Sequence, residues 1–301
     1  MTGSSLFIVN PAAGAGRAGE LWARIRRDLR DVSPNTIVTT RPGEATSIAQ
    51  EAASTYDRLI AVGGDGTVSE VAEGLLGLAG HRCALGVVPL GTGNDFARTI
   101  GIHRLPDAFQ ALARDHRRMI DVIEVHCVVN NKSLKRHALV FAGAGIIGTV
   151  LRNTTPLAKR VLGRAGAYRA GLLRALWHYK APRMRVLCDN AVSEGNYLFL
   201  GASNGEEAGG GMRLAPGARI DDGLLNLNLV GALSRWQAVK QLQSLSRGQH
   251  TSHPQVRYFA ARTMTLESDP VSDVAADGEI IGQTPARFVV KPKALLVLAH
   301  F

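Results

Sequence analysis

The stretch that decides the fold is Leu59-Ile60-Ala61-Val62-Gly63-Gly64-Asp65-Gly66-Thr67. Its first four residues are apolar and predict a buried strand, while Val71, Leu75 and Leu76 are spaced as on one face of a following helix. The glycines let the intervening backbone approach a ligand closely. Because the N–H groups of such a loop and of a helix N-terminus attract anions, the stretch predicts a phosphate site.

Asp65 needs a different explanation, since a carboxylate repels phosphate. A carboxylate in this place suits a contact to Mg²⁺ through water, and the ion would neutralise the phosphates. The alternative is a glycine-rich turn in which Asp65 only caps the helix.

Strand and helix patterns alternate on both sides of this loop, which predicts an α/β domain with a parallel sheet. Strands are expected at 6–10, 36–39, 59–62 and 85–89, and helices at 44–56 and 68–76. A second glycine turn, Pro89 to Arg98, follows the fourth strand, and there Thr92 and Asn94 offer a hydroxyl and an amide. Both turns would lie at the carboxyl ends of strands, where α/β folds bind ligands.

The pattern changes near residue 120, where short β-like runs replace the alternation. They cover 120–129, 138–142, 183–189, 197–202, 224–230, 263–267 and 288–290, with helices expected only at 157–179 and 234–246. This predicts a second domain, a mostly antiparallel β-sandwich. We place the first domain at 1–125, with a C-terminal tail at 287–301 that can return to it, and the second at 126–286.

Several motifs together resemble the diacylglycerol kinase catalytic domain, which diacylglycerol, ceramide and sphingosine kinases share with bacterial YegS-like lipid kinases. The resemblance covers almost the whole chain. The matching segments are Asn10 to Gly14, Thr39 to Gly43, Gly63 to Ser69, Thr92, Ser203 to Gly205, Pro216 to Leu225, and Asp277-Gly278-Glu279.

The resemblance implies a two-domain kinase of NAD kinase/diacylglycerol kinase-like fold that uses ATP and Mg²⁺. Residues 1–125 would bind the nucleotide and residues 126–286 the lipid. The implied nucleotide-binding residues are Asn10, Thr39, Thr40, Gly63, Gly64, Asp65, Gly66, Thr67, Thr92 and Asn94.

The resemblance also implies the catalytic and metal-binding residues. Glu279 would accept the proton of the lipid hydroxyl, with Asp277 close to the metal and Asp65 at the phosphates. Without the resemblance, Asp277-Gly278 is equally a surface hairpin turn. A second Mg²⁺ site would join Asp222 to the backbone carbonyls of Arg219 and Leu224, and Asp121 would add an acid to the metal network; Asp222-Gly223 is otherwise only a turn.

The reaction expected first is phosphorylation of diacylglycerol to phosphatidic acid. Ceramide, a sphingoid base or phosphatidylglycerol are alternative substrates, because each presents a hydroxyl on an apolar body. A soluble NAD kinase also uses a Gly-Gly-Asp-Gly-Thr loop, but the Pro89 to Arg98 turn and Asp277 to Glu279 argue against it. The presence of Asp65, Asp277 and Glu279 argues against a binding module that has lost catalysis.

The net charge of +10 is concentrated in one part of the chain, because no acidic residue occurs between Glu124 and Asp189. The basic segment 152–185 either docks to an anionic membrane or packs its apolar stripe on the β domain. With 5% aromatic residues, nucleic-acid stacking is not expected. We therefore expect a cytoplasmic protein, peripheral at the inner membrane surface. A homodimer is compatible with the sequence, which leaves the oligomeric state open.

Other motifs carry less weight. No apolar run is long enough for a transmembrane helix, and no signal peptide is expected. Cys83, Cys127 and Cys188 suggest buried free thiols. Gly143-x-Gly145-x-x-Gly148 lies in the β-rich half and is interpreted as a place of close backbone packing.

Overall fold

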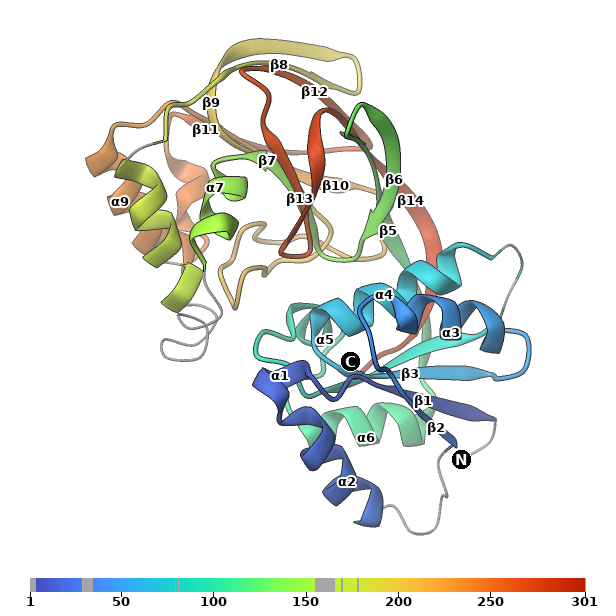
Figure 1. Ribbon diagram of the computed structural model, residues 1–301. Helices are drawn as coiled ribbons and strands as arrows, with labels where there is room; N and C mark the ends of the chain where they lie inside the picture. Colours follow the sequence, from blue (N-terminus) through green and yellow to red (C-terminus); the bar gives the residue numbers. More distant parts are fainter. Residues whose placement is uncertain are drawn as a thin grey trace. The chain divides into compact units, whose positions relative to one another are not determined.

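A computed structural model describes residues 4–28, 35–78, 80, 82–154, 166–168, 170–177 and 179–300. The chain divides into two compact units (Figure 1). Unit 1 comprises Met1–Ile120 and Lys293–Phe301, and unit 2 comprises Asp121–Pro292. The sequence placed these boundaries at 125 and 286.

Unit 1 contains strands whose pairings run parallel. They are β1 (Ser5–Val9), β2 (Asn35–Val38), β3 (Arg58–Gly63), β4 (Ala84–Pro89) and the end of β14 (Glu279–Leu298). β1 pairs with β2 and β3, β3 pairs with β4, and β4 pairs with β14 through Leu85 and Val297. The C-terminal end of the chain thus returns to the first sheet.

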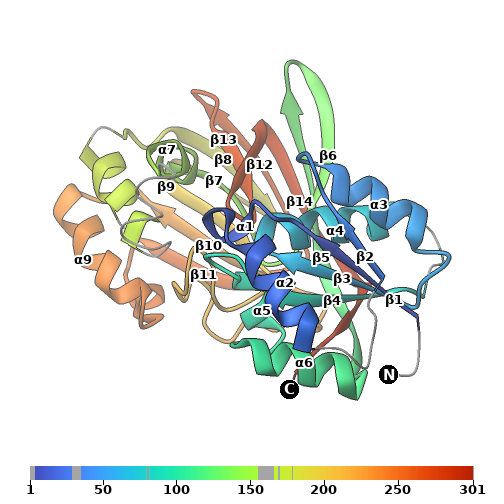
Figure 2. The same cartoon turned by 60° about the horizontal axis from the view of Figure 1, so that its bottom comes forward.

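Helices cover both faces of this sheet (Figures 1 and 2). They are α1 (Ala13–Gly16), α2 (Ala18–Asp28), α3 (Glu44–Ala52), α4 (Asp65–Leu76), α5 (Asp95–Thr99) and α6 (Leu105–Arg114). On one face α2 and α6 bury Trp22 and Leu112 against Phe7, Ile60 and Val88 of the strands. Helices α3 and α4 lie on the other face, so the unit has three layers.

The pair α3 and α4 packs closely because of two residues of α4. A Cβ at Gly74 would lie 2.5 Å from the carbonyl oxygen of Thr46, so the helices touch through backbone there. The Glu70 carboxylate accepts hydrogen bonds from the N–H groups of Gly43 (3.0 Å) and Ala45 (3.3 Å). It therefore satisfies donors at the N-terminus of α3, where the helix dipole favours negative charge.

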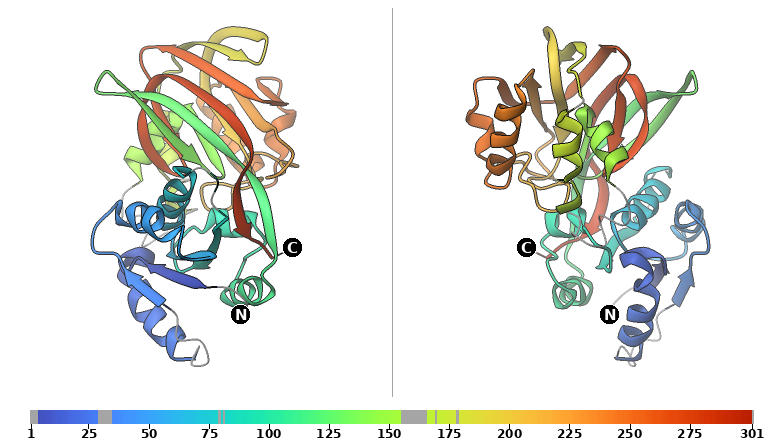
Figure 3. Two further views of the ribbon diagram at one scale, coloured as in Figure 1. Left: turned by 90° about the vertical axis from the view of Figure 1, so that its right-hand side faces the viewer. Right: turned by 60° about the vertical axis from the view of Figure 1, so that its left-hand side comes forward.

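Unit 2 is mostly antiparallel, as the sequence predicted. Its strands are β5 (Arg117–Val129), β6 (Lys132–Ala138), β7 (Phe141–Gly145), β8 (Arg183–Cys188), β9 (Ala191–Ser203), β10 (Leu225–Gly231), β11 (Val256–Ala261), β12 (Thr263–Asp269), β13 (Asp273–Ala276) and most of β14. Successive pairings run from β7 through β13, β14, β12, β8 and β9 back to β7. The sandwich-like domain is therefore closed and barrel-like (Figure 3).

The closure depends on two long strands that change partners along their length. β9 pairs with β8 through its first half and with β7 and β10 through its second. β14 pairs first with β13 and then with β12. The core between them holds Leu200, Met264 and Phe288, each fully buried.

The helices of unit 2 are α7 (Ile146–Asn153), residues 166–168 and 170–177, α9 (Arg235–Leu245) and the 3₁₀ turn η1 (Gln249–Ser252). The helix expected at 234–246 is confirmed as α9, which Ser234 caps. Part of the helix expected at 157–179 lies outside the described residues. Gly143 and Gly148 are places of close packing, since a Cβ at Gly143 would lie 2.5 Å from the Leu200 carbonyl oxygen.

The three cysteines are buried and free, as the sequence predicted. Burial raises the pKa of the Cys83 and Cys188 thiols to about 11. Within the described part of the chain, every helix is too short or too polar to cross a bilayer.

Candidate active site

The loop that follows β3 is held to the turn after β1. A Cβ at Gly63 would overlap the Thr67 side chain, so glycine allows α4 to begin immediately after the strand. Thr67 is buried, and its hydroxyl accepts a hydrogen bond from the Asn10 amide at 3.1 Å. The Asn10 side-chain oxygen Oδ1 accepts a hydrogen bond from the Ala12 N–H at 3.0 Å. Asn10 and Thr67 thus join two predicted nucleotide-binding turns.

The second glycine turn lies directly against the first. A Cβ at Gly91 would overlap the Gly64 Cα, and the Leu90 N–H donates to the Gly63 carbonyl. Asn94 adopts a left-handed conformation, and its amide makes two hydrogen bonds with the Gly91 backbone, at 3.0 and 3.1 Å. The Asn94 amide therefore closes the turn, whereas the Thr92 side chain is exposed.

Asp65 is the first residue of α4 and is almost fully buried. One of its carboxylate oxygens accepts a hydrogen bond from the Phe96 N–H at 3.2 Å. The predicted metal contact therefore also ties the start of α4 to the start of α5. A buried carboxylate stands next to two backbone-lined turns, which is the donor chemistry that a Mg²⁺–phosphate group requires.

The two threonine candidates after β2 differ in burial. Thr39 is buried, and its N–H and hydroxyl both donate to the Val9 carbonyl, at 2.8 and 3.3 Å. Thr40 is exposed, and its N–H and hydroxyl donate to the Glu44 carboxylate. The N–H and hydroxyl of Thr40 lower the pKa of Glu44. Thr39 fixes the strand end, while Thr40 lies on the surface beside it.

In unit 2, Asp277 and Gly278 form the two-residue turn of the β13–β14 hairpin. Ala276 pairs with Glu279, and both turn residues have positive φ (43° and 88°), as a type I′ turn requires. Glu279 begins β14 with an exposed side chain. The hairpin that the residues alone suggested is therefore real, and it presents the predicted proton acceptor at its tip.

The Asp277 carboxylate is held by three backbone N–H groups. Leu139 donates at 2.7 Å, and Val140 and Phe141 each donate at 3.0 Å. The Asp277 N–H donates in return to the Phe141 carbonyl at 2.9 Å. Both carboxylate oxygens are therefore used to fix the turn that carries Glu279.

Asn204 extends this network, and no role was predicted for it. It is fully buried; its amide donates to the carbonyls of Asp121 (2.7 Å) and Leu139 (3.0 Å), and its N–H donates to Val140. Asn204 thus joins β5, the 139–141 segment and the end of β9. The match at Ser203 to Gly205 was the only signal in the sequence, because the partners are distant along the chain.

The loop at 219–224 contains the second predicted metal site. The buried Asp121 carboxylate accepts from the Gly223 N–H at 2.6 Å, and the exposed Asp222 carboxylate accepts from the Leu224 N–H at 3.0 Å. The Arg219 side chain lies 3.5 Å from Asp221. The structure thus brings Asp121 to this loop. The donors are oxygens, as Mg²⁺ prefers, although the described residues contain no group of three metal-binding side chains.

Comparison with known proteins agrees with this architecture. Residues 4–125 match the diacylglycerol kinase catalytic domain, and residues 138–299 match the YegS C-terminal NAD kinase beta sandwich-like domain. The chain is 38% identical to a Pseudomonas aeruginosa protein named "Probable lipid kinase YegS-like", over 86% of this chain and 82% of that protein. It is 31% identical to a Staphylococcus aureus diacylglycerol kinase, over 94% and 88%.

A solved structure is also similar throughout. A Bacillus anthracis str. Sterne protein assigned as a diacylglycerol kinase superposes with a TM-score of 0.82 at 27% identity, covering 98% of this chain and 95% of that one. The fold and these matches define a lipid kinase, a phosphotransferase whose family implies the use of ATP. The chain belongs to the diacylglycerol kinase catalytic domain family.

Proposed function

We propose that this enzyme transfers the γ-phosphate of ATP to the hydroxyl of diacylglycerol and so forms phosphatidic acid. The observation that carries the proposal is the contact between two glycine turns at Gly64 and Gly91, with the Asp65 carboxylate beside them. Backbone N–H groups in such turns suit the phosphates of ATP. Phosphoryl transfer then depends mainly on position and charge neutralisation.

We assign different roles to the two acids of the hairpin. Glu279 is exposed at the start of β14 and accepts the proton of the attacking hydroxyl. Asp277 holds its own turn through three N–H groups, so its first role is to position Glu279. The nucleotide lies at the turns of Asn10, Gly63 to Thr67 and Thr92, with Thr39 and Thr40 at the neighbouring strand end.

Mg²⁺ belongs to the proposal as well. Asp65 would hold, through water, an ion that neutralises the phosphates. A second ion would be held by Asp222 and the carbonyls of Arg219 and Leu224, with Asp121 ordering the loop through Gly223. When bound, the first ion neutralises phosphate charge and the second stiffens the loop.

We further propose that the enzyme works in the cytoplasm at the inner membrane surface, where ATP and its lipid substrate meet. The basic segment 152–185 supports this proposal by its charge; its members Lys159, Arg160, Arg164 and Arg169 lie outside the described residues. Association into a homodimer stays a hypothesis.

The test is transfer of label from γ-labelled ATP and Mg²⁺ to a panel containing diacylglycerol, ceramide, sphingosine, phosphatidylglycerol and NAD. We expect the strongest labelling in diacylglycerol, presented in mixed detergent micelles. Labelling of ceramide, sphingosine or phosphatidylglycerol instead would still support a lipid kinase, but it would identify a substrate other than diacylglycerol. Labelling of NAD alone would overturn the proposal.

A further inference from the structure

Two tryptophans of unit 2 are exposed on neighbouring helical segments. Trp236 of α9 is 75% exposed and Trp177 is 51% exposed, whereas Trp22 of unit 1 is buried. The two segments pack on each other through Ala175, Leu176 and Ala238. Figures 1 and 2 show α9 beside the helix that contains residues 170–177. Rings of this size usually bury most of their surface, so their exposure points to a partner.

One contact joins the exposed side chains of the two segments. The Arg235 guanidinium lies over the Trp177 ring, 5.9 Å from its centre, so α9 and the 170–177 segment meet at the surface as well as in the core. Leu173 is 39% exposed one helical turn before Trp177. We call this surface the tryptophan face and define it by Leu173, Arg174, Trp177, Arg235, Trp236 and Lys240.

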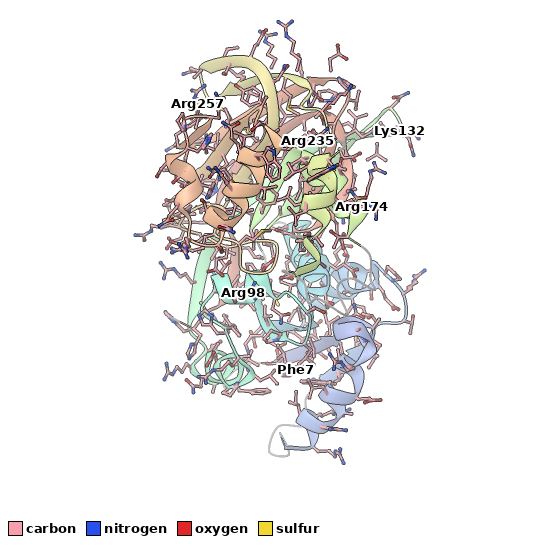
Figure 4. All side chains as sticks on the ribbon, turned by 90° about the vertical axis from the view of Figure 1, so that its left-hand side faces the viewer. Phe7, Arg98, Lys132, Arg174, Arg235 and Arg257 are labelled. Atoms are coloured by element: carbon pink, nitrogen blue, oxygen red, sulfur yellow. The ribbon has the colours of Figure 1, made fainter. Side chains whose placement is uncertain are left out.

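The charge of the tryptophan face is entirely positive. No acidic residue occurs between Asp222 and Glu267, and none occurs between Glu124 and Asp189. The helical segments that pack together therefore come from two acid-free parts of the chain. Figure 4 shows Arg174 and Arg235 on these segments, with Lys132 at the far edge of unit 2. Arg174, Arg235 and Lys240 form no ion pair with any acid of the described residues.

This combination favours one kind of partner. Tryptophan rings and arginines together suit the headgroup level of an anionic bilayer, where the ring is half apolar and half polar. Tryptophan and arginine also occur in protein interfaces, but lysine is depleted there, and this face carries Lys240 in addition to Arg174 and Arg235. Single-stranded nucleic acid would need a longer row of aromatic rings than these two.

We propose that the tryptophan face is the surface through which the enzyme contacts an anionic phospholipid bilayer, with Trp177 and Trp236 at headgroup depth. The inference rests on the proposed function in one respect: the substrate is a bilayer lipid. It adds α9 to the basic segment as a membrane-contacting element. The binding is peripheral, because the face offers two rings and one leucine rather than a continuous apolar helix.

The test is co-sedimentation of the full chain with vesicles of phosphatidylcholine, with and without phosphatidylglycerol, in the absence of ATP and diacylglycerol. We expect binding that depends on phosphatidylglycerol. Trp236→Ala should weaken it roughly tenfold through lost apolar contact, and Arg235→Glu at least about fivefold through lost attraction to the anionic surface.

Two matched controls keep the result specific. Val192→Ala removes another exposed apolar side chain, which is 56% exposed on β9, and Lys132→Glu reverses a charge on the β5–β6 hairpin. Both should bind vesicles as the wild type does. Equal binding by Trp236→Ala and the wild type would refute the proposal, as would a wild type that binds neither vesicle.

Two further measurements separate this inference from the other possibilities. In mixed micelles, where no bilayer has to be reached, Trp236→Ala should phosphorylate lipid at the wild-type rate. If no lipid is phosphorylated in micelles but vesicle binding still depends on Trp236, the proposed function is wrong, while the assignment of the tryptophan face as the membrane-contacting surface is supported. If light scattering shows a dimer that Trp236→Ala dissociates, with vesicle binding unchanged, the face is a contact between copies and the proposal fails.

Discussion

Gly91 is the residue on which the contact between the two glycine turns depends most directly. Alanine there would drive its Cβ into the Gly64 Cα, which is backbone and cannot rotate away. We predict that Gly91→Ala lowers the free energy of unfolding by about 1–3 kcal/mol and lowers ATP affinity, because both turns must shift. Chemical denaturation and nucleotide titration measure the two effects.

The control for Gly91→Ala is Gly195→Ala, where the nearest atom to the new Cβ is the Tyr197 ring at 3.7 Å, an ordinary contact. That variant should keep wild-type stability to within about 0.5 kcal/mol. An equal loss in both variants would mean that the Gly64–Gly91 contact has no special importance.

The Asn204 side-chain amide donates to two backbone carbonyl groups of unit 2. We predict that Asn204→Ala lowers the free energy of unfolding by about 2–4 kcal/mol, because the carbonyls of Asp121 and Leu139 each lose a donor. Asn204→Asp should cost at least as much, since a carboxylate oxygen would face the same carbonyls. Urea denaturation with the wild type alongside gives the difference.

The neighbouring Ser203→Ala is the matched control, because the buried Ser203 hydroxyl has no hydrogen-bond partner among the described residues. Its removal should leave stability unchanged or slightly raised. If Asn204→Ala is as stable as Ser203→Ala, the network does not hold this part of unit 2 together.

At the scale of the element, α3 depends on a carboxylate that comes from α4. We predict that Glu70→Ala destabilises the protein by about 1 kcal/mol or more, since the Gly43 and Ala45 N–H groups lose their acceptor. Glu70→Gln should cost less, because one oxygen still accepts. Thermal unfolding of these variants, compared with Glu51→Ala on the exposed side of α3, measures the effect.

The elements that the sequence predicted well are those with strong local patterns. Leu59 to Val62 precedes the glycine loop and forms β3, and the apolar spacing after it forms α4. The helix expected at 234–246 is α9, and Ser234 with Gln237 makes the capping box at its start, a local motif.

Two of the strands that the sequence missed have weak local patterns. β6 reads Lys132 to Ala138 with mostly polar side chains, and β13 has only four residues. β6 pairs with β5 across a two-residue turn, and polar side chains give it little apolar periodicity, while β13 is too short to show a period. β13 pairs with β7 about 130 residues earlier.

The site residues likewise divide into those that local sequence predicts and those whose contacts depend on distant parts of the chain. The glycine turns were predictable because strand, loop and helix are consecutive. The engagement of the Asn94 amide with Gly91 was not predictable from residue type, since the same amide suits a ligand equally well. The three hydrogen bonds from the backbone N–H groups of 139–141 to the Asp277 carboxylate depend on tertiary structure. The sequence alone indicated only a turn or a metal contact at Asp277.

At the scale of the whole molecule, both units keep their thiols protonated. Because burial raises the pKa of Cys83 and Cys188 to about 11, from 9.0 when exposed, the thiolate is scarce near pH 8. We predict slow reaction of the native protein with a disulfide reagent at pH 8 and fast reaction in denaturant. Fast reaction of the native protein would contradict the burial of these thiols.

The same shift has a consequence for stability. Folding favours the protonated form of each thiol, because the thiol of the unfolded chain ionises first. The stabilisation of the folded state that comes from this difference is fully present below pH 9. It is lost as the pH rises toward 11. We predict that the free energy of unfolding falls over this interval, and that Cys83→Ser reduces the fall. Urea denaturation at several pH values measures it.

The central claim is that one chain binds ATP phosphates beside Asp65 and activates a lipid hydroxyl with Glu279. The most direct test is the rate of γ-phosphate transfer to diacylglycerol in mixed micelles by the wild type, Glu279→Gln and Asp65→Asn, with folding checked by thermal unfolding. Glu279→Gln should fold normally and lose roughly 10²–10⁴-fold in rate, the range for a lost general base. Asp65→Asn should also lose activity, with a higher Mg²⁺ requirement. Transfer at the wild-type rate by both folded variants would contradict the account.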